Sequence, residues 1–160
     1  MQLLISDANI LIDLEEGGVL ASLFELPFDF VTPYILFYEE LEEHHGHLLD
    51  MGLGLGSLNG DEILEVEAAV AAYSGPSTND CMALVLARRE GCPLLTGDRA
   101  LRTVAGIEGI VVMGTIWVVE KLLEHELVTL HVAEEAFRRM RESGRRLPWD
   151  RAENMLERFR

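Results

Sequence analysis

The sequence predicts an α/β fold, a three-layer α/β/α arrangement around a central parallel sheet of four to five strands. Short apolar runs, bounded by glycine, proline and polar turn residues, alternate along the chain with segments in which apolar residues have helical spacing. Such alternation indicates a parallel sheet covered by helices on both faces. A chain of 160 residues that is 49% hydrophobic and 26% charged can bury the core that this fold needs.

The first two expected strands span residues 3–6 and 28–32, and helical segments follow each of them. These helical segments span residues 9–17, 19–26 and 34–45. Pro33 fits the first turn of the last one, where a missing backbone N–H has no cost. Residues 46–60 contain five glycines, and we expect them to form a flexible connection.

The second half of the chain continues the alternation with two more strands, residues 93–96 and 109–114. The helices expected around them span residues 61–75, 77–91, 99–106 and 115–126. The tail has two further helical stretches, interrupted at Gly144 and Pro148. We therefore expect a main domain over residues 1–130 and a C-terminal helical extension over residues 131–160, which packs on the domain or on a partner subunit.

The charge of the chain is strongly acidic and unevenly distributed. The net charge is −15, yet residues 133–160 hold eight arginines against six acidic residues, so the acidic excess lies in residues 1–132. This excess opposes broad electrostatic attraction to nucleic acid and suits divalent cations or a basic protein. Two cysteines without CxxC spacing, no membrane-spanning apolar run and no secretory signal predict a cytoplasmic protein.

Several carboxylates follow strands or begin helices. Asp7 and Asp98 follow two expected strands, and the carboxyl ends of parallel strands share one edge of a sheet, where ligands bind. Asp80 begins an apolar helix, and Glu39 or Glu40 can point to the same edge. Each of these acids also has a simpler interpretation, because Asp7, Asp80 and Asp98 can be helix caps and the two glutamates can lie on a solvated face.

Carboxylates that converge in one site repel one another and need a cation when all are ionised. Oxygen ligands alone select hard divalent ions, so the expected cofactor is Mg²⁺ or Mn²⁺. A metal held in this way can activate water and orient a phosphate ester. The residues therefore point to hydrolysis of phosphodiester bonds without a Ser–His–Asp triad.

At these residues the sequence resembles the PIN-domain nucleases. The matching pieces are ISDANILIDL, TPYILFYEEL, STNDCMALVLARREGCPLLTGDRALR and GIVVMGTIWVVEKL, which occur in the family's order over roughly residues 1–125. The run from Asp80 through Asp98 is the most specific part. The tail is similar to that of prokaryotic PIN proteins related to VapC-type toxins.

The resemblance implies a metal-dependent endoribonuclease with Asp7, Glu40, Asp80 and Asp98 as metal ligands and catalytic residues. It also implies that Asn9 and Thr96 hold these ligands in place through hydrogen bonds. The basic residues Arg99 and Arg102 follow Asp98 closely and are candidates for steering RNA toward the site; ion pairs with nearby glutamates are the alternative.

The partners expected from this interpretation are an RNA substrate, an antitoxin protein if the chain is a toxin, and a second copy in a homodimer, but no membrane. A phosphatase or phospho-acceptor is the weaker enzymatic alternative, since the position two residues after Asp7 is Asn9 and the only lysine is Lys121. A non-catalytic PIN-fold protein-interaction module is the other alternative, and the acidity of residues 1–132 favours it.

Overall fold

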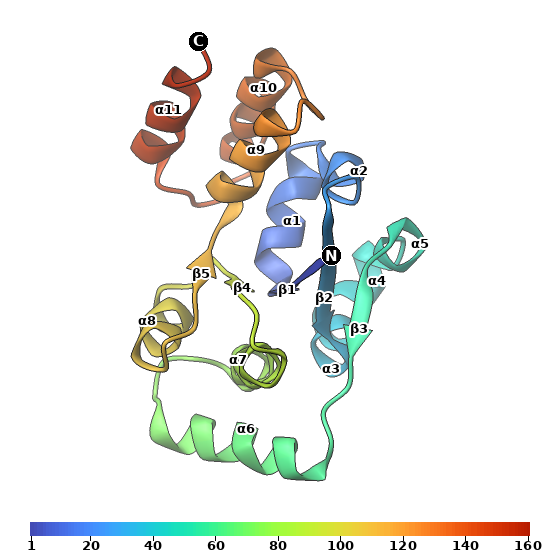
Figure 1. The fold of residues 1–160 in the computed structure, drawn as a ribbon, viewed down its shortest axis with the longest axis vertical. Coiled ribbons are helices and arrows are strands. Elements are labelled where there is room, and N and C mark those ends of the chain that lie inside the picture. Colours follow the sequence, from blue (N-terminus) through green and yellow to red (C-terminus); the bar gives the residue numbers. More distant parts are fainter.

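A five-stranded, wholly parallel sheet forms the centre of the protein in a computed structural model of residues 1–160. The strands lie in the order β3-β2-β1-β4-β5 (Figure 1). Helices cover both faces, so the predicted three-layer α/β/α fold with four to five parallel strands is confirmed. The strands are β1 (Gln2–Ser6), β2 (Phe28–Pro33), β3 (Gly54–Gly56), β4 (Leu94–Leu95) and β5 (Val112–Met113).

The alternation of side chains along the strands divides the core into two parts. Leu4 and Leu95 belong to the larger cluster of buried residues, whereas their neighbours Ile5 and Leu94 belong to a cluster on the other face. Ile5 pairs with Val31 on one side and with Leu94 on the other, which fixes the register of the three central strands. The carboxyl ends of β1, β2 and β4 therefore lie at one edge of the sheet.

The segment 46–60 is not the wholly flexible connection that its glycines predict, because it contains a helical turn and the edge strand β3. Gly54, Leu55 and Gly56 pair in parallel with residues 31–33 of β2. The two glycines allow a close approach, since a Cβ atom at Gly54 would lie 3.1 Å from the Val31 Cγ2 atom and one at Gly56 would lie 2.5 Å from the Leu86 Cδ2 atom. A strand with one apolar side chain between two glycines has no apolar run, so the hydrophobic pattern does not predict it.

The larger layer of helices packs above the sheet in Figure 1 and includes the C-terminal tail. Its core cluster contains 27 buried residues, among them Ala133, Ala136, Phe137, Met140 and Leu156 of the tail. Gly144 separates the last two helices and has a positive φ of 87°, a conformation that glycine adopts without strain. The helices of this layer are α1 (Ala8–Glu16), α2 (Leu20–Leu23), α9 (Thr115–Glu124), α10 (Leu130–Glu142) and α11 (Trp149–Glu157).

The opposite layer is built on α7, whose residues 81–87 are all buried. Ala83, Leu84 and Ala87 face the sheet, while Cys81, Met82 and Val85 contact a further helix outside, α6. Gly91 ends α7 in the left-handed conformation with a φ of 62°, as is typical after a helix. The helices are α6 (Gly60–Ala72), α7 (Thr78–Glu90) and α8 (Arg99–Ile107).

The helix expected over residues 34–45 is interrupted by one turn of π-helix. The α-helical parts α3 (Tyr34–Leu36) and α4 (Glu42–His45) flank the π-helical turn η1 (Phe37–Leu41), and the short α5 (Leu48–Met51) follows. Phe37 and Leu41 are buried, so the turn is anchored in the core. Glu39 and Glu40 lie within it, and single π turns of this kind occur often at functional sites.

No helix of the protein combines the length and the apolar character needed to cross a bilayer.

Candidate active site

Asp7 lies at the centre of the candidate site, directly after the central strand β1. Its side chain caps α1, because its Oδ1 atom accepts a hydrogen bond of 3.0 Å from the Ile10 backbone N–H. Its Oδ2 atom accepts a hydrogen bond from the hydroxyl of Thr96, which follows β4. Asp7 is only 2% exposed and Thr96 is fully buried, so the end of strand β1 is tied to the end of strand β4 within the protein interior.

Burial gives Asp7 unusual titration behaviour. Desolvation of the carboxylate raises its pKa from 3.8 to about 7, although the hydrogen bonds from Thr96 and Ile10 act in the opposite direction. The negative charges of Asp80 and Asp13 raise this pKa further. Asp7 is therefore a carboxyl group that is partly protonated at neutral pH and lies within electrostatic reach of two other acids.

Asp80 lies in the first turn of α7, where it completes a capping box with Ser77. Its Oδ2 atom accepts a hydrogen bond of 2.9 Å from the Ser77 backbone N–H, and its own N–H donates to the Ser77 Oγ atom at 3.1 Å. The expectation that Asp80 acts as a helix cap thus describes its local contacts, as it does for Asp7. The charge of Asp80 nevertheless raises the pKa of both Asp7 and Glu40, so Asp80 acts on both groups.

The two glutamates of the π turn are joined to α7 by Asn79. The Asn79 Nδ2 atom donates to one carboxylate oxygen of Glu39 and to one of Glu40, each at 3.0 Å. Partial burial raises the pKa of Glu40 above its ordinary value, the Asn79 hydrogen bond lowers it, and the charges of Asp80 and Glu39 raise it again. The pKa of Glu40 therefore depends on the charge of the nearby Asp80.

Asp98 lies on the other side of Asp7, at the start of α8. Its Oδ1 atom accepts a hydrogen bond of 2.8 Å from the Leu101 N–H, so it too is a helix cap. Its backbone N–H donates to the Thr96 Oγ1 atom at 3.1 Å, which links it to Asp7 through that hydroxyl. A polar cavity of about 350 Å³ opens beside Asp98, lined by Asn9, Asp13, Gly97, Asp98, Gly144, Arg145 and Arg146.

The chemistry of these side chains suits a hard divalent cation, although they do not form a ready-made cage. All four predicted ligands are carboxylates, the donors that Mg²⁺ and Mn²⁺ prefer, and the raised pKa values of Asp7 and Glu40 reflect burial and repulsion that a cation would counteract. No three carboxylate, imidazole or thiolate groups of the protein are arranged to hold a metal ion. Binding of one ion by all four ligands therefore remains a prediction.

The other predicted residues of the site have different surroundings. Thr96 binds Asp7 directly, whereas Asn9 is exposed and its Oδ1 atom accepts a hydrogen bond of 3.2 Å from Arg145. Arg99 and Arg102 are both exposed, and no carboxylate forms an ion pair with either of them. Arg102 lines a second cavity close to that of Asp98.

A partly buried ion pair lies beside the site, and no sequence pattern predicts it. The Arg145 Nε atom donates to the Asp13 Oδ1 atom at 2.6 Å, and the Thr115 hydroxyl donates to the Asp13 Oδ2 atom at 2.7 Å. Asp13 and Arg145 are 132 positions apart in the sequence, so no local pattern links them. The one available signal was a carboxylate between apolar residues of an amphipathic helix, ILIDL.

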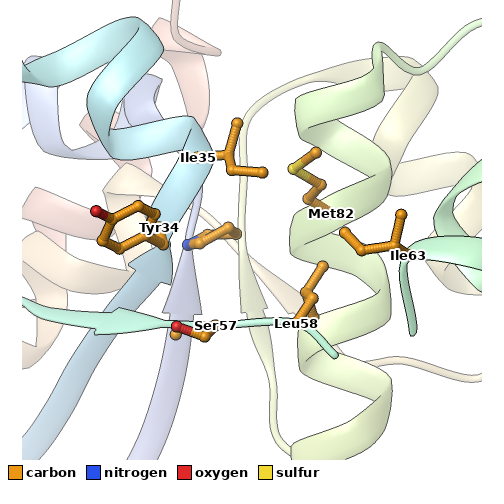
Figure 2. A pocket seen from close by; sticks show the side chains of 8 residues that line it. Tyr34, Ile35, Ser57, Leu58, Ile63 and Met82 are labelled. Carbon is orange, nitrogen blue, oxygen red and sulfur yellow. The ribbon is translucent and has the colours of Figure 1, made fainter. Parts of the chain in front are cut away.

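An apolar pocket of about 150 Å³ lies on the glutamate side of the site (Figure 2). Ile35 of α3 and Met82 of α7 point toward one another across it, and Leu58 and Ile63 line its wall. These are the two helical segments that Asn79 also joins through Glu39 and Glu40. Tyr34 also lines it and packs against Tyr38, and the ring centroids of these two exposed side chains are 4.7 Å apart.

Comparison with known proteins gives one finding for nearly the whole chain. Residues 3–160 match a family model, DUF3368, of a PIN domain. No curated protein shows a significant match to the chain.

Proposed function

The chain belongs to the PIN-domain family, and from this premise we propose that it is a metal-dependent endoribonuclease. PIN domains are generally nucleases and typically use divalent metals, so a nuclease-type fold is established and the remaining specificity is our proposal. The proposal assigns Mg²⁺ or Mn²⁺ as the cofactor and RNA as the substrate, with cleavage that leaves 5′-phosphate and 3′-hydroxyl ends.

The observation that carries the proposal is the electrostatic coupling of acids around the end of β1. Asp7 is buried with a pKa of about 7, and the charge of Asp80 raises the pKa of both Asp7 and Glu40. Perturbed carboxylates that gather at the carboxyl edge of a parallel sheet are typical of a catalytic or metal-binding site. A carboxylate that served only as a helix cap would not need to be buried as deeply as Asp7, which is 2% exposed.

Two groups of residues would form such a site: carboxylates that hold the metal ion, and side chains that orient these carboxylates through hydrogen bonds. Asp7, Asp80, Asp98 and Glu40 would hold the ion, which when bound supplies Lewis acidity for the attack of water on phosphorus as the P–O3′ bond breaks. Thr96 fixes one oxygen of Asp7 and the backbone of Asp98, and Asn79 fixes Glu39 and Glu40. The burial of Asp7 and Thr96 keeps bulk water from one side of the site.

A role as the toxin of a toxin–antitoxin pair is part of the same proposal. An antitoxin protein would then bind over the acidic rim, and two copies of the chain would form a homodimer. Co-purification of a small protein with the chain expressed together with its neighbouring reading frames tests the first partner. Measurement of the mass in solution tests the second.

The experiment that tests the enzymatic proposal compares RNA cleavage by the purified protein and by Asp98→Asn in Mg²⁺ or Mn²⁺. We expect cleavage by the wild type and its loss in the variant. Asp61→Asn, which removes the same charge at the start of the outer helix α6, is the matched control and should cut at the wild-type rate. An unchanged rate in Asp98→Asn would reject the assignment.

The alternative proposal is a PIN-fold protein-interaction module that cuts nothing. The net charge of −15 supports it, because an acidic surface attracts basic proteins and repels RNA. Calorimetry with Mn²⁺ near neutral pH separates the two functions. Heat from a stoichiometric site that Asp98→Asn removes supports the nuclease, and a silent titration supports the module.

A further inference from the structure

A second cavity adjoins the candidate site on the side of β5 and is unusually basic for so acidic a chain. It has a volume of about 330 Å³, and its walls include three arginines, Arg102 of α8, Arg146 of the loop before α11, and Arg151 of α11. It shares Asp13, Gly97 and Arg146 with the cavity of Asp98, so the two spaces are neighbours. We refer to the space lined by Arg102, Arg146 and Arg151 as the arginine cavity.

The three arginines keep their charges uncompensated within the protein. The two carboxylates that also line the arginine cavity already have other partners, since Asp13 pairs with Arg145 at 2.6 Å and Glu120 pairs with Arg158 at 2.7 Å. In contrast, Arg88, Arg89, Arg138 and Arg160 each bind at least two acidic side chains. Three exposed arginines that face one cavity without acidic partners repel one another, and an anion would relieve that repulsion.

Two helix N-termini add to the positive potential of the same cavity. Gly114 precedes α9 and Pro148 precedes α11, and neither residue offers a side chain to cap the first turn; the first turn of α9 has no acidic residue, whereas Asp150 in that of α11 offsets part of its dipole. Gly114, Thr115 and Pro148 all line the arginine cavity. Uncapped backbone N–H groups and the helix dipoles therefore favour a negative group at the place where the guanidinium groups gather.

We propose that the arginine cavity binds a backbone phosphate of single-stranded RNA, adjacent to the phosphate that lies beside Asp98. The inference rests on the proposed function and extends it to the path of the strand. The shared wall of the two cavities gives the strand a continuous route from Asp98 to Arg151. Arg146 contributes to both cavities, so it lies between the cleaved phosphate and its neighbour.

The phosphodiester backbone is the occupant that the chemistry favours. Guanidinium groups bind phosphate oxygens in a two-pronged geometry, and helix N-termini bind phosphate readily. Single-strand binding proteins use a positively charged groove that tracks the backbone. The apolar Trp117 and Ile116 in the same wall give the strand a surface without repulsive charge.

The test measures the salt dependence of binding by the full chain to a fluorescent single-stranded oligoribonucleotide, in EDTA so that no metal-dependent cleavage occurs. Each phosphate contact contributes about 0.7 to the slope of log K against log salt for single strands. Arg146→Gln/Arg151→Gln removes two of the three guanidinium groups that would hold this phosphate, so it should lower that slope by about 0.7 and weaken binding at low salt on the order of tenfold. Arg139→Gln, on the exposed face of α10 and away from both cavities, should leave the slope unchanged.

A charge-restoring variant separates a phosphate contact from a structural role. Arg146→Lys/Arg151→Lys should regain most of the slope, because the slope counts charges that meet phosphates. An unchanged slope in the glutamine variant would overturn the proposal. So would the absence of RNA binding by the wild type, or displacement of RNA by an oligo-glutamate of equal charge at equal concentration.

The same measurements distinguish this inference from the proposed function. If Asp98→Asn cuts RNA normally, the catalytic assignment fails, while the salt slope still reports on the arginine cavity. If cleavage depends on Asp98 but the glutamine variant keeps the full slope, the strand follows another route and only the present inference fails.

Discussion

The two sides of strand β1 carry opposite charges at the carboxyl edge of the sheet. On the side of β2, Glu39 and Glu40 accept hydrogen bonds from the side-chain amide of Asn79, and the charge of Asp80 raises the pKa of Glu40. On the side of β5, the arginine cavity gathers three arginines and two helix N-termini. Asp7 lies between them, at the end of the strand that separates the two sides. The proposed cation and the proposed RNA phosphate would thus occupy separate places that lie next to one another.

This difference shows why net charge is a poor guide to what the protein binds. The net charge of −15 describes the whole chain, whereas a nearby phosphate responds to charges within about 10 Å at ordinary ionic strength. The tail supplies Arg146 and Arg151, so its local basicity is brought to the edge of an acidic body. For the proposed RNA path, the objection that acidity raises applies to the β2 side and not to the β5 side.

The largest expected effect comes from the carboxyl group between the two sides. The pKa of Asp7 is raised from 3.8 to about 7, so the folded protein holds a proton that the unfolded chain has released between those pH values. The contribution of Asp7 to the free energy of unfolding should therefore fall as pH rises through this range, by about 1.4 kcal/mol per unit and about 4 kcal/mol in total. Asp7→Asn should remove this loss, so the variant should gain stability over the wild type from pH 4 to pH 8.

Urea unfolding of both proteins at several pH values measures this difference. Asp61→Asn controls for the loss of one acidic group at the surface and should show no such trend. A difference between Asp7→Asn and wild type that stays constant with pH would mean that Asp7 is not held in a desolvated position. The stable variant should nevertheless be inactive, since it loses a proposed ligand.

The next prediction compares how two neighbouring arginines on the β5 side contribute to the free energy of unfolding. Arg145 is paired with the buried Asp13, whereas Arg146 has no acidic partner. Asp13→Ala leaves the Arg145 guanidinium and the Thr115 hydroxyl without their partner, and we expect a loss of about 3 kcal/mol in the free energy of unfolding. Arg146→Gln should change that free energy by less than about 0.5 kcal/mol, because it removes an exposed charge.

Chemical denaturation of Asp13→Ala, Arg145→Ala and Asp13→Ala/Arg145→Ala, with the wild type, gives a double-mutant cycle. A coupling energy near zero between Asp13 and Arg145 would show that the pair does not hold the tail against α1. The paired Arg145 and the unpaired Arg146 would then not differ in what they contribute to the free energy of unfolding.

Local sequence patterns predict some parts of the fold and of the candidate site, but not all. Asp7 and Asp98 were expected at strand ends because apolar runs precede them, and the structure has both at the ends of parallel strands. Strand β3 escaped prediction because it consists of Gly-Leu-Gly, whose pairing depends on the backbone of β2. The Asp13–Arg145 pair escaped because it joins positions 132 apart, and such contacts are decided by packing.

The π turn on the β2 side gives the third prediction, which decides between two adjacent glutamates. Glu40 has a pKa raised by burial and by Asp80, so Glu40 is the proposed ligand. We expect Glu40→Gln to lower the rate of RNA cleavage by about a hundredfold and Glu39→Gln by less than about threefold, as loss of a direct ligand and of a neighbouring charge. Single-turnover cleavage in Mn²⁺ measures both, and equal losses would show that the π turn presents the two acids equivalently.

The smallest expected effect concerns Asn79, which joins the two glutamates to α7. Its amide donates to Glu40 and lowers that pKa, so Asn79→Ala should let the pKa rise further above its ordinary value. Because the proposed ligand must be ionised, the acid limb of the pH–rate profile should move to higher pH. The rate at high pH should fall only about threefold, as expected for the loss of one hydrogen bond to this carboxylate. Glu39→Gln/Asn79→Ala gives the control, since removal of the Glu39 charge should shift the limb partly back. A limb that moves to lower pH in Asn79→Ala would contradict the view that the amide holds Glu40 as a carboxylate. Some residue other than Asn79 of α7 would then have to position Glu39 and Glu40.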